Sequence, residues 1–166
     1  MAPKKLPVRP TTDFAKEALF NILANKIDFD EVSLLDLFSR TGNISFEFAS
    51  RGTQEITSVD AHYGCVKYIN QISDELEFSI KTVKSDVFKY LKTTPFTFDV
   101  IFADPPYNLK QEEFESIVNI TFDRNLLKEE GFLIIEHSKH TDLSKTAHFI
   151  DARRYGGSVF SFFEYS

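Results

Sequence analysis

The sequence of 166 residues contains a single cysteine and no tryptophan. Because Cys65 is alone, an internal disulfide and any metal site built from several cysteines are excluded. The four histidines lack the spacing of a metal motif, so no metal ion is expected. No apolar run approaches the roughly 20 residues of a membrane span, and no apolar signal segment follows Lys4 and Lys5. These absences predict a soluble, cytoplasmic protein that does not bind membranes.

Acidic residues outnumber basic ones, 25 against 19, so the formal net charge of the chain is −6. A negative balance argues against a nucleic-acid partner, since phosphate binding depends on Lys and Arg. The charge is uneven, however: residues 1–16 carry four basic side chains against one acid, and Arg153 and Arg154 form a second basic spot. Such patches can bind phosphate on an acidic protein, although ordinary solvated surface charge explains them equally well.

The length and the 42% of hydrophobic residues suit one domain with a single ordinary core. We expect a basic N-terminal segment over residues 1–10 and a single domain over residues 11–166, in a monomeric protein. In the segment 11–27, TTDFAKEALFNILANKI, a Thr-Thr-Asp capping signal precedes apolar residues at helical spacing. This pattern predicts an amphipathic helix.

Short apolar runs then alternate with longer amphipathic ones. The alternation predicts an α/β fold in which right-handed crossovers build a mostly parallel, seven-stranded sheet that is covered on both faces. After residue 146 the pattern changes, and two runs on either side of Gly156 and Gly157 predict an antiparallel hairpin at the edge of the sheet. The parallel strands are expected at 32–38, 55–60, 78–83, 98–103 and 131–137, and the helices between them at 44–50, 65–72, 87–92 and 113–122.

Acidic residues lie at or near the ends of the first four of these strands: Asp36, Asp60, Asp86 and Asp104. The carboxyl ends of parallel strands meet at one edge of a sheet, and ligands bind there where the strand order reverses. Carboxylates at that edge favour ribose hydroxyls and amino-bearing ligands over phosphate. The alternative is that each acid caps the helix that follows, an explanation that suits Asp86 best.

The segment 98–109, FDVIFADPPYNL, joins an apolar run to an acid, two prolines and a tyrosine. Pro105 and Pro106 lack the N–H groups that a strand needs, so the chain must leave the sheet there. Asp104 and Tyr107 are then held on a stiff, extended segment that suits the binding of a flat, polar ligand. A proline-rich turn that simply ends the strand is the alternative.

Four stretches of the chain resemble one family: LPVRPTTDFAKEALFNIL, LLDLFSRTGNISFEFASRG, SVD and FDVIFADPPY. They are similar to the S-adenosylmethionine-dependent methyltransferases of the small-subunit ribosomal RNA methyltransferase D type, which modify the exocyclic N2 of a guanine in 16S ribosomal RNA. The resemblance covers about residues 6–164. It implies a Rossmann-like methyltransferase fold, S-adenosyl-L-methionine as cofactor, and ribosomal RNA or the small ribosomal subunit as partner.

The resemblance also implies which residues form the site. The strand-end acids and the turn after the first strand would bind the cofactor, the Asp-Pro-Pro-Tyr segment would hold the target base, and the opening segment would contact RNA. The implied cofactor-binding residues are Asp36, Phe38, Arg40, Gly42, Asp60, Asp86, Val87 and Asp104, the implied catalytic residues are Asp104, Pro105, Pro106 and Tyr107, and the implied substrate-binding residues are Arg9, Thr11 and Tyr107.

Each implied role has a chemical reason. Asp36 would lie beside the methionine part of the cofactor, Asp60 would accept the ribose hydroxyls, and Asp86 with Val87 would contact the adenine. The carboxylate of Asp104 and the carbonyl of the following proline would accept both hydrogens of a guanine amino group, which turns the nitrogen lone pair towards the methyl group. The ring of Tyr107 would stack on a base taken out of its helix.

The chain departs from this family in two places. MAPKKLPV stands where the family has a basic, Gly-containing segment, and in the cofactor turn Ser39 and Arg40 stand where the family has a small residue followed by Gly. Glycine serves where a ligand approaches the backbone closely or φ is positive. An arginine there could fill the cofactor's place beside the sulfonium, point outward, or pair with Asp36 or Asp60.

Three functions are therefore compatible with the sequence. The first is an active methyltransferase for an amino group of a base in ribosomal RNA. The second is a non-catalytic relative that keeps the fold and RNA binding, with Arg40 closing the cofactor turn. The third is an amino-methylating enzyme for DNA or small molecules, because Asp-Pro-Pro-Tyr occurs among enzymes with several substrates. The intact segment 104–107 favours catalysis.

Overall fold

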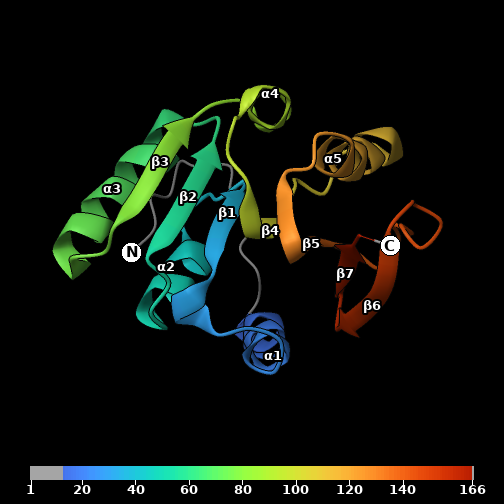
Figure 1. Ribbon diagram of the computed structural model, residues 1–166, viewed down its shortest axis with the longest axis horizontal. Coiled ribbons are helices and arrows are strands. Elements are labelled where there is room, and N and C mark those ends of the chain that lie inside the picture. Colours follow the sequence, from blue (N-terminus) through green and yellow to red (C-terminus); the bar gives the residue numbers. More distant parts are fainter. Residues whose placement is uncertain (1–12, 166) are drawn as a thin grey trace.

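A computed structural model describes residues 13–165 of the protein as one seven-stranded sheet with helices on both faces (Figure 1). The strand order is β3-β2-β1-β4-β5-β7-β6. The strands are β1 (Ser33–Leu37), β2 (Glu55–Asp60), β3 (Ile80–Lys84), β4 (Phe98–Ala103), β5 (Leu127–Ser138), β6 (Phe149–Tyr155) and β7 (Ser158–Glu164). The helices are α1 (Asp13–Ala24), the 3-10 helix η1 (Phe29–Glu31), α2 (Asn43–Ser50), α3 (Tyr63–Leu76), α4 (Val87–Thr93) and α5 (Gln111–Asp123).

The central strands are parallel and buried, as their apolar runs predict. All five residues of β1 are buried, and β1 pairs in parallel with β2 on one side and with β4 on the other. A parallel strand covered on both faces has no polar side, which explains why SLLDL shows no alternation. The one acid in this run, Asp36, therefore lies inside the protein.

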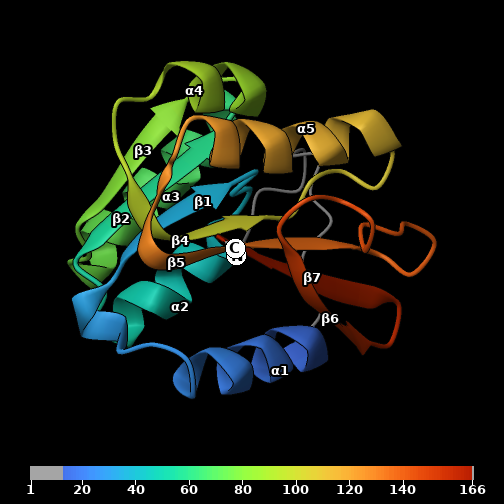
Figure 2. The same ribbon diagram turned by 45° about the vertical axis from the view of Figure 1, so that its right-hand side comes forward.

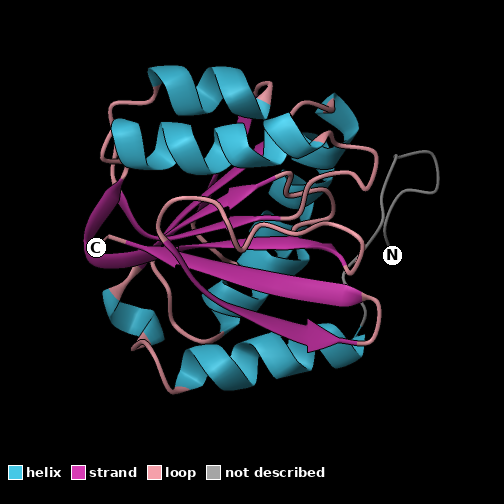
Figure 3. Cartoon of the chain, turned by 90° about the vertical axis from the view of Figure 1, so that its right-hand side faces the viewer, coloured by secondary structure: helices cyan, strands magenta, loops and turns pink. Residues whose placement is uncertain are grey.

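Two apolar clusters cover the two faces of the sheet, and Figures 2 and 3 show the layers of helices on either side of it. On one face α1 and α2 pack against β1, β4 and β5, and on the other face α4 and α5 do so. The residues that α1 buries recur at the spacing of one helical face. They are Ala15, Leu19, Phe20 and Leu23.

The C-terminal hairpin lies at the sheet edge that the sequence predicts. Strand β7 is antiparallel to both β5 and β6, and the turn between β6 and β7 contains Gly156 at φ +64°. Strand β5 begins four residues before the expected start at 131, because it pairs with the first residue of β4 through Phe98 and Leu127 before an irregularity in the register. A Cβ on Gly131 would lie 2.7 Å from the carbonyl oxygen of Asp99, so glycine permits this irregularity.

The strand order reverses between β1 and β4, as the resemblance implies. One crossover leaves β1 towards β2 and β3, and the chain then returns to the other side of β1 as β4. In such sheets the carboxyl ends on either side of the reversal frame a crevice. The Rossmann-like α/β fold expected from the sequence is confirmed, whereas the boundary expected at residues 10 and 11 lies outside the described residues. Over residues 13–165 no helix combines the length and apolar character needed to cross a bilayer.

Candidate functional site

Three of the four strand-end acids are buried together at the carboxyl edge of the sheet. Asp36 of β1, Asp60 of β2 and Asp104, directly after β4, are each at most 4% exposed. Asp86 differs, because it is exposed and its carboxylate accepts a hydrogen bond from the backbone N–H of Lys89 at 2.9 Å, which caps α4. The capping explanation therefore holds for Asp86.

The turn between β1 and α2 has an unusual backbone. Phe38, Arg40 and Gly42 all have positive φ, at 57°, 50° and 80°. Only glycine adopts this conformation without steric cost, so the two side-chain-bearing residues are strained. At Gly42 the need for glycine is also one of packing, since a Cβ there would lie 2.9 Å from Cγ1 of Ile69. Gly42 therefore shapes the turn. It does not line either of the two cavities that open beside this turn.

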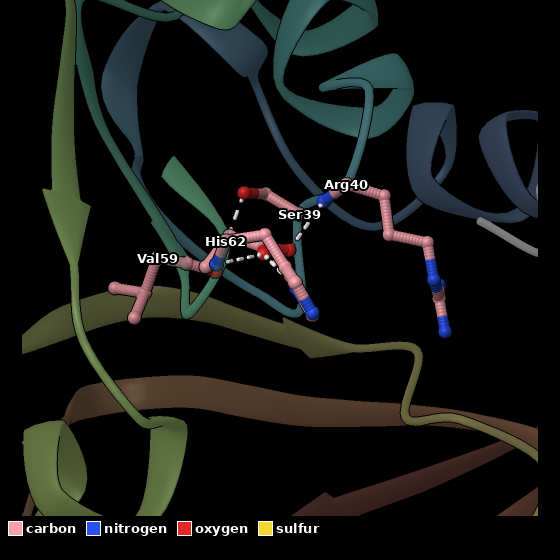
Figure 4. Close-up of polar contacts among 5 residues, drawn as sticks. Ser39, Arg40, Val59 and His62 are labelled. Carbon is pink, nitrogen blue, oxygen red and sulfur yellow. Dashed lines mark hydrogen bonds and ion pairs between the residues drawn. The ribbon is translucent and has the colours of Figure 1, made fainter. Parts of the chain in front are cut away.

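Hydrogen bonds to β2 hold this turn in place (Figure 4). The backbone N–H and the hydroxyl of Ser39 both donate to the carbonyl oxygen of Val59, at 3.1 and 3.2 Å. The backbone N–H of Arg40 donates to Oδ2 of Asp60 at 2.9 Å. The carboxylate at the end of β2 thus fixes the position of Arg40, where the resemblance implies a glycine.

The side chain of Arg40 lies over the segment after β4. Figure 4 shows it leading away from Val59 and His62, and its Nη1 lies 2.6 Å from Oδ2 of Asp104. Both side chains are nearly buried, at 11% and 6% exposure. The sequence left several positions open for this side chain. The structure shows that the guanidinium does not point outward and that it pairs with Asp104 rather than with Asp36 or Asp60.

Asp36 has a strongly perturbed pKa. Burial raises its pKa from 3.8 to about 7, although hydrogen bonds from Ser45 and the charge of Arg40 act in the opposite direction. The hydroxyl of Ser45 donates to Oδ2 of Asp36 at 2.6 Å and lies 2.6 Å from the hydroxyl of Ser58. Near neutral pH this carboxyl group exists in both protonation states.

Asp60, His62 and Cys65 form a second group at the end of β2. The backbone N–H and the ring Nδ1 of His62 lie 2.9 and 3.1 Å from Oδ1 of Asp60. One ligand atom from each of the three residues lies within 4.8 Å of the others, so the group could hold a metal ion. However, burial and the neighbouring Asp60 carboxylate raise the pKa of the Cys65 thiol to about 12. A metal would have to displace this tightly held proton, and we assign none.

Two cavities open beside the turn. The outer cavity has a volume of about 310 Å³, within the range of small-ligand pockets. The inner cavity, of about 20 Å³, is enclosed by the turn, Asp36 and Asp104 and is almost filled. Phe38 and Arg40 line both. The outer cavity is lined by Phe38, Arg40, Asp60, Ala61, His62, Cys65, Asp86, Val87, Pro106 and Asn108.

The outer cavity fits part of the implied cofactor. It combines Asp60, whose carboxylate suits hydroxyl donors, with the apolar side chain of Val87, and its volume suits a nucleoside. The inner cavity has no room for a further group while the Arg40 guanidinium lies against Asp104. The residues present therefore fit the adenosine end directly, and the methionine end after a movement of the Arg40 side chain.

The Asp-Pro-Pro-Tyr segment leaves the sheet as expected. Asp104 and Pro105 are buried, whereas Pro106 and Tyr107 are exposed, the tyrosine at 76%. The carbonyl oxygen of Pro106 accepts a hydrogen bond from the N–H of Leu109 at 3.0 Å, which turns the chain towards α5. A buried acid and an exposed aromatic ring are thus presented on the same short segment.

The sequence did not single out several members of the site. Ser45, which donates to the buried Asp36, and Ser58, which contacts Ser45, carry no motif, and their contact joins α2 to β2. Cys65 was noted only as a lone cysteine, although its position at the start of α3 places it beside Asp60. The substrate-binding residues implied for the opening segment, Arg9 and Thr11, lie outside the described residues.

Comparisons with known proteins agree with the fold. The protein named Ribosomal RNA small subunit methyltransferase D from Haemophilus influenzae is 28% identical over 159 residues, which cover 84% of this chain and 76% of that protein. The protein of the same name from Escherichia coli is 27% identical over 140 residues, which cover 80% of this chain and 69% of that protein. A solved structure titled "Putative methyltransferase yhhF from Escherichia coli" is 22% identical, with a TM-score of 0.83, over 98% of this chain and 89% of that one.

A second solved structure is the 16S rRNA N2 methyltransferase RsmC of T. thermophilus in complex with AdoMet and guanosine. It is 17% identical, with a TM-score of 0.75, over 93% of this chain and 43% of that one. The resemblance that the sequence motifs indicated is confirmed. The family described as Conserved hypothetical protein 95 matches residues 1–164, and the chain belongs to that family.

Proposed function

We propose that the protein transfers a methyl group from S-adenosyl-L-methionine to the exocyclic N2 of a guanine in small-subunit ribosomal RNA. The observation that carries this proposal is the outer cavity, which lies beside the Asp-Pro-Pro-Tyr segment and is lined by Asp60 and Val87. The names of the relatives, ribosomal RNA methyltransferases, support the reaction and the class of substrate. The guanine N2 is supported by the RsmC structure, whose title names that atom and guanosine.

The cofactor supplies a methyl group activated by a sulfonium. Asp60 would bind the ribose hydroxyls, because it lines the outer cavity at the end of β2 and its carboxylate oxygens accept hydrogen bonds from hydroxyl groups. Val87, which lines the outer cavity together with Asp86, would contact the adenine. Asp36, which lines the inner cavity, would hold the amino-acid end.

The protein's contribution at the target amine is orientation. The amine of guanine is conjugated into its ring and is a poor nucleophile, so alignment of its lone pair matters more than a strong base. The carboxylate of Asp104 and the carbonyl of Pro105 accept its two hydrogens. When bound, S-adenosyl-L-methionine would supply the methyl group and leave as the thioether, and the proton given up by the amine would pass to water. For this to occur, Arg40 has to leave the oxygen of Asp104 that it now contacts.

The target base has to leave its helix before it can reach Asp104. Tyr107, at 76% exposure directly after the two prolines, stacks on the extruded base. The exposed side chains of Arg153 and Arg154 lie on β6 and can contact phosphates of the RNA. We propose that the protein acts as a monomer on the RNA or on the small ribosomal subunit.

The test is transfer of a labelled methyl group. S-adenosylmethionine labelled in its methyl group is incubated with small ribosomal subunits, with the free RNA and with DNA, and the modified nucleoside is identified by mass spectrometry. We expect N2-methylguanosine in the RNA or the subunit. The Asp104→Ala variant should lose at least about 100-fold in rate, the lower range for removal of a group that stabilises a transition state. Cofactor binding should persist.

Asp123→Ala is the matched control, because Asp123 is an exposed acid at the end of α5. It should transfer methyl at the parent's rate. Label in DNA alone, or on another atom of the RNA, would contradict the proposed substrate. An equal loss of cofactor affinity and of melting temperature in Asp104→Ala would contradict the role of Asp104.

A further inference from the structure

The two cavities beside the turn are strongly acidic. Asp36, Asp60, Asp86 and Asp104 line them, and among the described residues in their walls Arg40 is the one side chain with a permanent positive charge. The cofactor of the proposed function carries a carboxylate on its amino-acid end. A carboxylate placed among acids requires a cation beside it. Among the lining residues, Arg40 can supply this positive charge.

We propose that Arg40 binds the carboxylate of the cofactor's amino-acid end, exchanging its present partner Asp104 for that carboxylate. This inference rests on the proposed function and adds to it a residue that stands where the family has glycine. Arg40 is thus a ligand for the cofactor, and the same movement takes the guanidinium off Oδ2 of Asp104.

The position of Arg40 suits this exchange. It lines both the outer cavity and the inner cavity, so it lies next to both parts of the proposed cofactor site. Its backbone is fixed by the hydrogen bond from its N–H to Asp60 at 2.9 Å, which leaves the long side chain as the part that moves. The guanidinium presents several donors in a rigid fork that matches a carboxylate, and its contact with Asp104 uses Nη1.

The strained backbone supports a ligand role over a purely structural one. Arg40 holds φ at 50°, a conformation that costs a residue with a Cβ free energy, whereas glycine would adopt it at no steric cost. Strain of this kind is concentrated at ligand-binding and catalytic positions.

The experiment compares two ligands that differ in the carboxylate. Isothermal titration calorimetry measures the dissociation constants of S-adenosylhomocysteine and of its decarboxylated analogue, which keeps the adenosine, the thioether and the amine. Neither ligand carries a sulfonium, so repulsion between that group and the guanidinium does not enter. The parent should prefer S-adenosylhomocysteine by about tenfold or more, as expected for a hydrogen-bonded charged group.

The Arg40→Met variant should lose this preference, because methionine keeps a long side chain and the Cβ at positive φ but has no charge. Arg40→Lys should keep part of it, since lysine retains the charge without the fork. Arg51→Met, at an arginine that pairs with Glu47 away from both cavities, is the matched control and should prefer S-adenosylhomocysteine as the parent does. Asp104→Asn should tighten S-adenosylhomocysteine binding several-fold in the parent and have no such effect in the Arg40→Met background.

The outcomes separate the two proposals. If Arg40→Met binds both ligands more tightly but with the parent's preference, Arg40 merely obstructs the cavity and its assignment as a ligand is wrong. If the parent binds both ligands equally, the cofactor site stands and the assignment of Arg40 fails. If the folded parent binds neither ligand, the proposed cofactor itself is wrong, and the inference about Arg40 falls with it.

Discussion

The hydroxyl of Ser45 donates a hydrogen bond of 2.6 Å to Oδ2 of Asp36, so the first turn of α2 is tied to the middle of the sheet. This bond favours the charged form of Asp36, but burial has the larger effect and leaves the pKa of Asp36 at about 7. The protein therefore contains an internal carboxyl group that changes its charge near neutral pH. Such a group makes stability depend on pH in a direction opposite to that of an ordinary paired acid.

The first prediction concerns this dependence. Because the pKa of Asp36 is about 7 in the folded protein against 3.8 as its ordinary value, the folded state binds more protons between these values than the unfolded state does. The contribution of Asp36 to the free energy of unfolding is thus favourable at low pH and is lost as pH rises from about 4 to about 7, by at most about 1.4 kcal/mol per pH unit.

Urea unfolding at pH 5 and at pH 8 measures the effect. The Asp36→Asn variant cannot titrate, so it should gain stability relative to the parent on going from pH 5 to pH 8. The matched control is Asp74→Asn, an exposed acid on α3, which should follow the parent. An identical change with pH in the parent and in Asp36→Asn would show that Asp36 is ionised throughout.

The second prediction concerns the thiol of Cys65. Burial and the adjacent Asp60 carboxylate raise its pKa from 9.0 to about 12, and the side chain is 1% exposed. Since the thiolate is the reactive form, its population at pH 8 should be on the order of a thousandfold lower than that of an unperturbed cysteine. Alkylation by iodoacetamide, followed by mass spectrometry, should be slow in the folded protein and fast in urea.

Removal of the neighbouring charge should accelerate this alkylation. Asp60→Asn lowers the pKa of Cys65 because it removes the second-largest cause of the shift. Asp74→Asn removes a charge of the same sign elsewhere and should leave the rate unchanged. If Asp60→Asn reacts as slowly as the parent, access to the buried sulfur rather than its pKa limits the reaction.

The third prediction separates the ring of Tyr107 from its hydroxyl. Stacking on a base requires the aromatic face, so Tyr107→Phe should largely retain methyl transfer, while Tyr107→Ala should weaken RNA binding by about 1–3 kcal/mol. Because the side chain is 76% exposed, both variants should melt close to the parent. The measurement is the RNA dissociation constant and the transfer rate of each variant. A Phe variant as impaired as the Ala variant would argue for the hydroxyl and against stacking.

The fold could be predicted from the sequence because its signals are local. Buried parallel strands such as β4 are short apolar runs, and the Gly156-Gly157 turn between β6 and β7 is visible in the chain itself. The start of β5 was placed too late, at 131, because the additional pairing of Leu127 with Phe98 depends on tertiary contact. Periodicity contains no information about such an extension.

The acids of the candidate site could be located for the same reason, since topology brings all strand ends to one edge. The ion-pair partner of Arg40 could not be predicted, because Asp104 lies 64 residues further along the chain. The sequence suggested Asp36 or Asp60 instead. Only the folded turn, with positive φ at Arg40 and its N–H fixed on Asp60, directs the guanidinium to Asp104 after the end of β4. The roles assigned to these residues in binding remain predictions.

The contact between α1 and the C-terminal hairpin has a consequence for folding during synthesis. Lys26, just after α1, pairs with Glu164 of β7 at 2.9 Å, and the ring of Phe14 packs edge-on against Tyr155 of β6. Leu19 shares its apolar cluster with residues of β7. During synthesis the helix is therefore made long before the strands that help to cover it. The apolar side of α1 is therefore fully covered only after β7 has been made.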